Sequence, residues 1–168
     1  GLANSEPGVI LDLPARDAHG WLTGEGAAGL LLLDVTQAVG RIPFSFSRSG
    51  ADLAVLSAHK LGGPKGVGAL IVRRGLDIPA LSLGGGQEIG RRSGTENIIG
   101  IAGFGAAIEA AMQDLARGVW ERVEKLRSIL EISLEASAKK TIFVGKDRAR
   151  LPNTSCFVSD GWKGETQV

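Results

Sequence analysis

Residues 53–72 read LAVLSAHKLGGPKGVGALIV. The stretch begins with one apolar run, residues 53–57, and ends with another, residues 67–72. A third run, GLLLLD, occupies residues 29–34. Short apolar runs that are bounded by turn residues are typical of strands buried on both faces of a sheet. The sequence therefore predicts three strands in the sheet of an α/β fold.

The segments around these strands carry helical signals. Residues 12–27 are compatible with a helix that its glycines weaken. Apolar residues then recur at helical spacing over 101–115 and again over 119–134. Strands that alternate with helices favour an α/β protein, and we expect a mainly parallel sheet.

A domain boundary is predicted near Gly118, where one amphipathic pattern ends and a charged helix begins. Residues 1–117 are expected to be a glycine-rich part of a large α/β domain. Residues 118–168 are expected to begin a small α+β domain, in which residues 141–144 and 154–158 have the pattern of strands.

The composition excludes several classes of partner. The 168 residues include 19 basic and 18 acidic side chains, for a net charge of +1, without any block of like charge. No nucleic-acid partner is therefore expected. No uninterrupted apolar run is as long as a membrane span, so no membrane partner is expected either. The single cysteine fits a reducing compartment, and we expect a cytoplasmic protein with a small-molecule or protein partner.

Ser57, His59 and Lys60 bring a hydroxyl, an imidazole and an amine to the end of one predicted strand. Ligands of α/β sheets bind beyond the carboxyl ends of strands, where Asp34 also falls. The hydroxyl and imidazole suit a phosphate, and an amine beside a phosphate is what a Schiff base with pyridoxal 5'-phosphate requires. Asp34 would keep the pyridine nitrogen protonated, and Gln37 would donate to the ring oxygen. Each residue also has an ordinary interpretation, as a solvated strand end, a turn cap or a polar loop residue.

A second glycine cluster, residues 84–97, reads GGGQEIGRRSGTEN. Such a loop before a helix can bind an anion through Thr95 and the helix amides, or it is a flexible loop in which Thr95 or Asn97 caps the helix. It lacks the ending of a Walker loop, and residues 62–68 contain no dinucleotide fingerprint, so nucleotide binding is disfavoured. His19 has no second ligand near it, and no metal site is predicted.

Four motifs follow one another along the chain: DVTQAVGRIP at 34–43, SAHKLGGPKGVGAL at 57–70, GGGQEIGRRSGTEN at 84–97 and LPNTS at 151–155. Together they closely resemble the cysteine desulfurases, pyridoxal-phosphate enzymes of fold type I (aspartate-aminotransferase-like) that take sulfur from L-cysteine. RSGTEN and GPKG are similar to the branch that serves iron–sulfur cluster assembly. The resemblance implies a homodimer that forms L-alanine and a protein-bound persulfide, with a sulfur-acceptor or scaffold protein as partner.

The resemblance also implies roles for the residues at the strand ends. Lys60 would be the catalytic residue that carries the cofactor and moves the α-proton. Asp34 would pair with the pyridine nitrogen and Gln37 would contact the ring oxygen. Ser57 and His59 would bind the phosphate.

Two further positions follow from the same resemblance. Thr95 would reach the phosphate of the neighbouring subunit, which makes the loop at 84–97 a dimer element. Where the family reads Asn-Asn-Glu-x-Gly, residues 4–8 of this chain read NSEPG. Ser5 therefore stands where the family has an asparagine that contacts cofactor and substrate, and it is shorter and lacks the amide.

Other groups of the family would lie outside these residues. The ring that stacks on the cofactor is expected upstream of Gly1, and the nucleophilic cysteine and the substrate-binding arginine downstream of Val168. We therefore expect an internal piece of a longer enzyme, with little activity of its own. Cys156 lies in a strand-like run without the glycines and serines of a mobile loop, and we interpret it as a small buried hydrophobe.

Two other functions stay open. Another fold-type-I lyase, acting on selenocysteine or cysteine sulfinate, would share the cofactor residues but not the nucleophilic cysteine. A non-catalytic paralogue would serve as a scaffold for sulfur-carrier proteins, and Ser5 is the feature that supports it.

Overall fold

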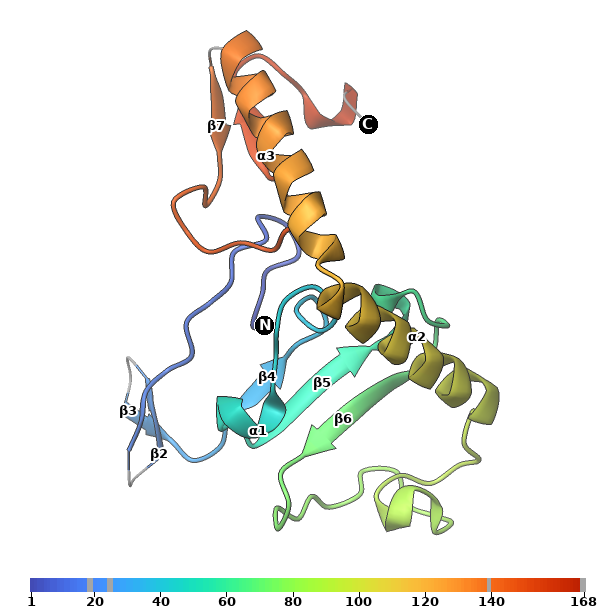
Figure 1. Ribbon diagram of the computed structural model, residues 1–168. Helices are drawn as coiled ribbons and strands as arrows, with labels where there is room; N and C mark the ends of the chain where they lie inside the picture. The colour runs from blue at the N-terminus through green and yellow to red at the C-terminus, as the bar shows by residue number, and fades with distance from the viewer. Residues whose placement is uncertain (18–19, 24–25, 139, 167–168) are drawn as a thin grey trace.

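The computed structural model describes residues 1–17, 20–23, 26–138 and 140–166. A small central sheet lies beside helix α2, and helix α3 extends away from it together with a two-stranded sheet (Figure 1). In chain order the elements are β1 (Arg16–Asp17), β2 (Gly20–Thr23), β3 (Gly26–Ala28), β4 (Leu32–Asp34), α1 (Phe46–Ser49), β5 (Leu53–Ser57), the 3₁₀ turn η1 (Ala58–Leu61), β6 (Gly68–Val72), η2 (Gln87–Gly90), α2 (Ile98–Ala116), α3 (Val119–Ser137), β7 (Thr141–Phe143), β8 (Phe157–Ser159) and η3 (Gly164–Thr166).

The central sheet has the strand order β4-β5-β6, so the three predicted strands are present. β4 and β5 are parallel, with Leu33 opposite Ala54. β6 is antiparallel to β5, with Ser57 opposite Gly68. The described sheet is therefore mixed rather than mainly parallel, which corrects the expectation. Residues 58–67 are too few for the crossover of about a dozen residues that a parallel neighbour needs, so the chain turns back beside β5.

A second, antiparallel sheet of β1, β2 and β3 replaces the helix expected over residues 12–27. The Trp21 side chain is only 4% exposed. Its Nε1 donates to Oδ2 of the fully buried Asp52 at 3.2 Å. This contact with a residue far along the chain favours strands over the weak local helical signal. His19 lies outside the described residues.

The two predicted helices are present and meet at Gly118. α2 ends at Ala116 and α3 begins at Val119. Gly118 has a φ of 71°, a left-handed conformation that glycine adopts without strain. The domain boundary that we place near this turn stays a prediction.

Helix α2 packs against the central sheet and η1. Phe104 is buried, and a Cβ added to Gly103 would lie 2.6 Å from Cγ of Pro64, so the helix approaches the loop after η1 closely. The residues Ile98–Ala116 have a mean hydropathy of 1.3 and are long and apolar enough to cross a membrane by length and composition alone. One such helix is weak evidence of a membrane span.

The N-terminal segment joins the sheet to the C-terminal part of the chain. The amide of Leu2 donates to the carbonyl of Asp34 at 2.8 Å, and the amide of Leu151 donates to the carbonyl of Gly8 at 2.7 Å. Gly8 has a φ of 72°, and a Cβ there would lie 2.6 Å from Cβ of Thr154. The LPNTS segment therefore packs directly on the N-terminal turn.

The C-terminal part is held together by a buried ion pair. Arg150 donates from Nη1 and Nη2 to the two carboxylate oxygens of Glu131 in α3, at 2.8 and 2.9 Å. The Ser155 hydroxyl donates to the same carboxylate at 2.7 Å. β7 and β8 pair as an antiparallel ribbon beside α3. β8 begins at Phe157, later than expected, so Cys156 lies just before the strand and is half-buried.

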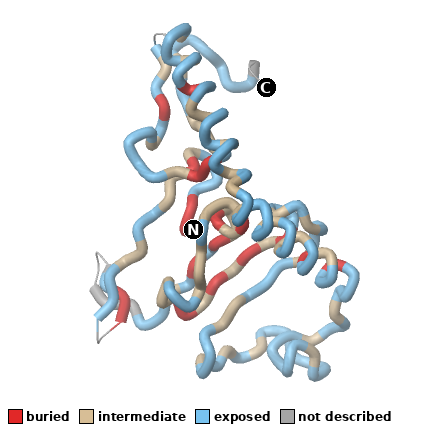
Figure 2. The backbone as a smooth tube through the Cα atoms, in the orientation of Figure 1, coloured by how far each residue is buried: buried red, intermediate tan, exposed pale blue. Residues whose placement is uncertain are grey.

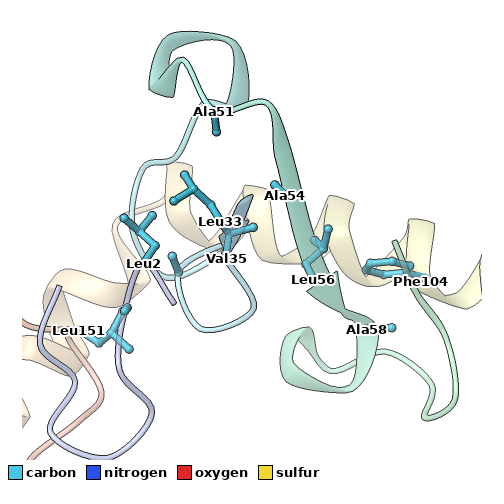
Figure 3. Packing of buried hydrophobic residues seen from close by; sticks show 11 residues of the cluster. Leu2, Leu33, Val35, Ala51, Ala54, Leu56, Ala58, Phe104 and Leu151 are labelled. Carbon is cyan, nitrogen blue, oxygen red and sulfur yellow. The ribbon is translucent and has the colours of Figure 1, made fainter. Parts of the chain in front are cut away.

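Buried residues concentrate along β4 and β5 and beneath α2 (Figure 2). Figure 3 shows Leu33 and Val35 facing the side of β5 that carries Ala54 and Leu56, with Phe104 at one end. The cluster consists of Leu2, Ala3, Leu33, Val35, Ala38, Ala51, Ala54, Leu56, Ala58, Phe104 and Leu151. This core fixes the ends of β4 and β5, where the candidate site lies.

Candidate functional site

Asp34 is the last residue of β4, and the chain turns sharply after it. The amides of Ala38 and Val39 both donate to the carbonyl of Val35 at 3.0 Å. The amide of Thr36 donates to Oδ1 of Asp34 at 2.9 Å. Hydrogen bonding by the hydroxyl and the amide of Thr36 holds the pKa of the Asp34 carboxyl below its ordinary value, despite partial burial. The turn therefore presents a negative charge at the carboxyl end of β4.

Lys60 lies in η1, directly after the parallel neighbour strand β5. Gly62 ends the turn with a φ of 83°. The amide of Gly63 donates to the carbonyl of Ala58 at 3.0 Å. The Lys60 side chain is exposed and makes no ion pair with any of the residues that the structure describes. Its amine is therefore not engaged by a carboxylate among the described residues.

The N-terminal turn is the third segment of the candidate site, after the turns that follow β4 and β5. The amide of Glu6 donates to Oδ1 of Asn4 at 2.8 Å, and the amide of Asn4 donates to the carbonyl of Val9 at 2.9 Å. These bonds fold residues 4–9 into a tight turn, with Ser5 exposed near its tip.

A cavity of about 570 Å³ lies where these three segments meet. This volume is in the usual range for small-molecule sites. The structure thus brings four of the sequence-predicted residues together around one space. The polar side chains of its lining are Asn4, Ser5, Asp34, Thr36, Gln37 and Lys60.

Two other predicted residues lie beside the cavity rather than in its lining. The Ser57 hydroxyl and Nδ1 of His59 are 2.8 Å apart, so the two side chains form a pair at the start of η1. Both residues lie within three positions of Lys60 in the chain, but neither is part of the cavity wall. Their predicted role toward a phosphate stays a prediction.

Thr95 is exposed and is not part of the cavity lining. The loop that contains it, residues 84–97, is yellow-green in Figure 1 and lies apart from η1, beyond β6. One copy of the chain therefore does not bring Thr95 to Lys60. The predicted contact of Thr95 with a neighbouring subunit is a separate question, which the single chain leaves as a prediction.

Sequence reasoning missed three residues of the site. Asn4 and Thr36 line the cavity and stand directly beside the predicted residues Ser5 and Gln37 in the sequence. This position was the signal that could have identified them. Arg41 also lies in a quoted motif, but its contact with Lys60 depends on the packing of two loops. Its Nη2 donates to the carbonyl of Lys60 at 2.7 Å.

The described residues show no group placed for a metal ion and no cysteine in the cavity lining. In the part of the chain that the structure describes, no group of three or more His, Cys, Asp or Glu residues is placed to hold a metal ion. Cys156 lies outside the cavity lining, and its carbonyl accepts a hydrogen bond from the amide of Val144 at 2.8 Å.

A family model described as Aminotransferase class-V matches residues 18–167 of the chain. The chain belongs to the class-V aminotransferase family. This class-V aminotransferase chain is 41% identical over 168 residues to a cysteine desulfurase from Cereibacter sphaeroides, covering 99% of this chain and 41% of that protein. It is 42% identical over 163 residues to a cysteine desulfurase from Bradyrhizobium diazoefficiens, covering 97% of this chain and 40% of that protein.

A solved structure of a NifS-like protein from Rickettsia africae ESF-5 is similar to the class-V aminotransferase chain in three dimensions. The TM-score is 0.75 at 35% identity, over 81% of this chain and 37% of that one. The chain therefore spans about two fifths of the length of the curated relatives it matches.

Proposed function

We propose that this chain is part of a cysteine desulfurase, a pyridoxal-phosphate enzyme of fold type I that transfers sulfur from L-cysteine to a protein thiol. The observation that carries the proposal is a cavity whose lining contains Lys60, Asp34 and Gln37 together. The identity with two cysteine desulfurases over nearly the whole chain supports it.

The residues around the cavity fit this cofactor. When bound, pyridoxal phosphate supplies a ring that accepts electrons from the substrate. Asp34 is a carboxylate with a lowered pKa, which suits a protonated ring nitrogen. The amide of Gln37 can donate to the ring oxygen. The Ser57 hydroxyl, the His59 imidazole and the amides of η1 are donors for a phosphate beside Lys60.

In the proposed reaction each residue has a defined task. Nζ of Lys60 would hold the cofactor and would accept the proton that leaves the substrate Cα. Asp34 keeps its negative charge throughout. Overall, the C–S bond of cysteine breaks and an S–S bond to an acceptor thiol forms. The products are L-alanine and a persulfide, and no external oxidant or reductant is consumed.

The proposal includes a homodimer in the cytoplasm, with a sulfur-acceptor or scaffold protein of iron–sulfur cluster assembly as its partner. Support for the second subunit comes from the apolar side chains near the loop at 84–97. Leu81 is 99% exposed, Leu83 83% and Ile89 90%. Large exposed apolar side chains that gather in one region of the surface mark sites of protein–protein interaction.

The test is a lysine exchange in the full-length protein. Lys60→Ala should abolish the yellow absorbance of the bound cofactor and the formation of alanine from L-cysteine. Lys65→Ala is the matched control, because Lys65 is an exposed lysine of the same loop and does not line the cavity. Retention of absorbance and activity by Lys60→Ala would contradict the proposal. Turnover of selenocysteine or cysteine sulfinate, without turnover of L-cysteine, would favour the related lyases.

A further inference from the structure

Arg41 connects the two loops that carry the candidate site. Its Nη1 donates to the carbonyl of Gln37 at 2.9 Å and, more distantly, to that of Thr36 at 3.5 Å. Its Nη2 donates to the carbonyl of Lys60 at 2.7 Å. One planar guanidinium therefore binds the turn after β4 and the turn after β5 at the same time. Such a fork holds two acceptors in fixed geometry, which a lysine ammonium does not.

The surroundings of Arg41 favour its hydrogen bonds to the carbonyls of the two loops. The guanidinium is half-buried, and burial lowers the pKa of Arg41. Among the described residues, no carboxylate forms an ion pair with it, and its buried Nε has no partner. Withdrawing an arginine from water without a carboxylate partner costs free energy. The carbonyls of the two loops are the acceptors that offset this cost.

We propose that Arg41 is a positioning residue of this site. It acts through the main chain: it fixes the carbonyl of Lys60 relative to that of Gln37, and thereby sets where the Lys60 side chain begins beside the cavity that Asp34 also lines. It does not line the cavity and does not touch the substrate space itself. The inference deepens the proposed function and rests on it for the role of Arg41 in catalysis. The hydrogen bonds by which Arg41 joins the two loops, called the clamp below, do not depend on that function.

The experiment compares three variants of the full-length protein. Arg41→Met keeps an unbranched, though shorter, side chain and removes all donors, and Arg41→Lys keeps the charge but loses the planar fork. Arg48→Met is the matched control, because Arg48 is an exposed arginine of α1 that has no part in the site. Three quantities are measured: the dissociation constant for pyridoxal phosphate, the pH at which the absorbance of the bound cofactor changes, and amide hydrogen exchange of the cofactor-free protein.

We expect Arg41→Met to weaken cofactor binding about tenfold, because the two loops lose the charged donor that they share, and to shift the pH of the absorbance change. In the cofactor-free protein, hydrogen exchange should become faster in peptides over 35–42 and 58–63 and stay unchanged elsewhere. Arg41→Lys should retain thermal stability yet bind the cofactor more weakly than the parent does. Arg48→Met should match the parent in every measurement.

Unchanged exchange in these two segments of Arg41→Met would overturn the clamp. A lowered melting temperature with unchanged cofactor affinity and pH profile would reduce Arg41 to a structural residue and overturn its positioning role. If the parent protein does not bind pyridoxal phosphate at all, the proposed function fails, and hydrogen exchange still decides whether Arg41 joins the two loops.

Discussion

The hydroxyl of Ser57 lies 2.8 Å from Nδ1 of His59, at the point where β5 ends and η1 begins. The pair presents a hydroxyl and an imidazole beside Lys60, within one turn of chain. If the pair binds the phosphate, Ser57→Ala and His59→Ala should each weaken binding of pyridoxal phosphate about tenfold in the full-length protein. Because the two side chains contact each other, the double variant should lose less than the sum of the single losses.

Fluorescence titration with the cofactor measures these affinities. Ser47→Ala serves as the control, since Ser47 is an exposed serine of α1 outside the site. Equal affinities for the parent, Ser57→Ala and His59→Ala would remove both residues from the cofactor site.

Two glycines of α2 offer a matched test of how closely the helix packs against the loop after η1. A Cβ at Gly103 would lie 2.6 Å from Cγ of Pro64, whereas a Cβ at Gly105 would meet nothing within 4 Å. Gly105→Ala should stabilise the protein by up to about 1 kcal/mol, because alanine favours the helix. Gly103→Ala should lower the free energy of unfolding by about 1–3 kcal/mol, because the extra methyl group pushes α2 from the loop after η1. Urea unfolding measures both, and stabilisation by Gly103→Ala would show that the approach is looser than described.

The ion pair of Glu131 and Arg150 predicts a dependence of stability on pH. Hydrogen bonding by Arg150, with help from Ser155, holds the pKa of Glu131 below its ordinary value near 4.5, although burial opposes this. A carboxyl whose folded pKa is lowered contributes stability that is fully present above its unfolded pKa and is lost as the pH falls through the folded pKa. The contribution should therefore be complete at neutral pH and decline below about pH 4.5.

Glu131→Gln should lower the free energy of unfolding by about 3 kcal/mol at neutral pH, because Arg150 is left buried without its charge partner. The difference from the parent should shrink as the pH falls below 4.5. Glu135→Gln in the same helix removes an exposed pair with Lys146 and should cost less than about 1 kcal/mol. Urea unfolding at several pH values checks this, and a difference between Glu131→Gln and the parent that does not change with pH would be the contrary result.

Asp52 is expected to hold the β1-β2-β3 sheet against the central sheet. Its fully buried carboxylate accepts from Nε1 of Trp21, the amide of Leu31 and Nε of Arg73. Asp52→Ala would leave buried donors without an acceptor, so we expect a loss of about 3 kcal/mol and a red shift of tryptophan fluorescence. Asp77→Ala, at an exposed position, should change neither quantity. Unaltered stability of Asp52→Ala would mean that water replaces the carboxylate.

The sequence indicated the elements whose signals are local. β5 was expected over residues 53–57 and spans them, because an apolar run between turn residues is enough to specify a buried strand. The helices on either side of Gly118 followed from apolar spacing in the same way. The sheet of β1, β2 and β3 was missed, because the contact of Trp21 with Asp52 joins residues far apart in sequence.

In the candidate site, too, some features follow from local sequence and others depend on tertiary contacts. The amino-acid sequence by itself indicated which residues are candidates for the chemistry: Asp34 ends an apolar run, Gln37 and Lys60 follow such runs by three positions, and residues that follow parallel strands meet at one sheet edge. Only the tertiary structure decided that the N-terminal turn with Ser5 closes the cavity, and that Arg41 joins the two loops behind it. The physical reason is that these contacts depend on the packing of separate segments against one another. A sequence pattern within one segment does not show which other segments pack against it.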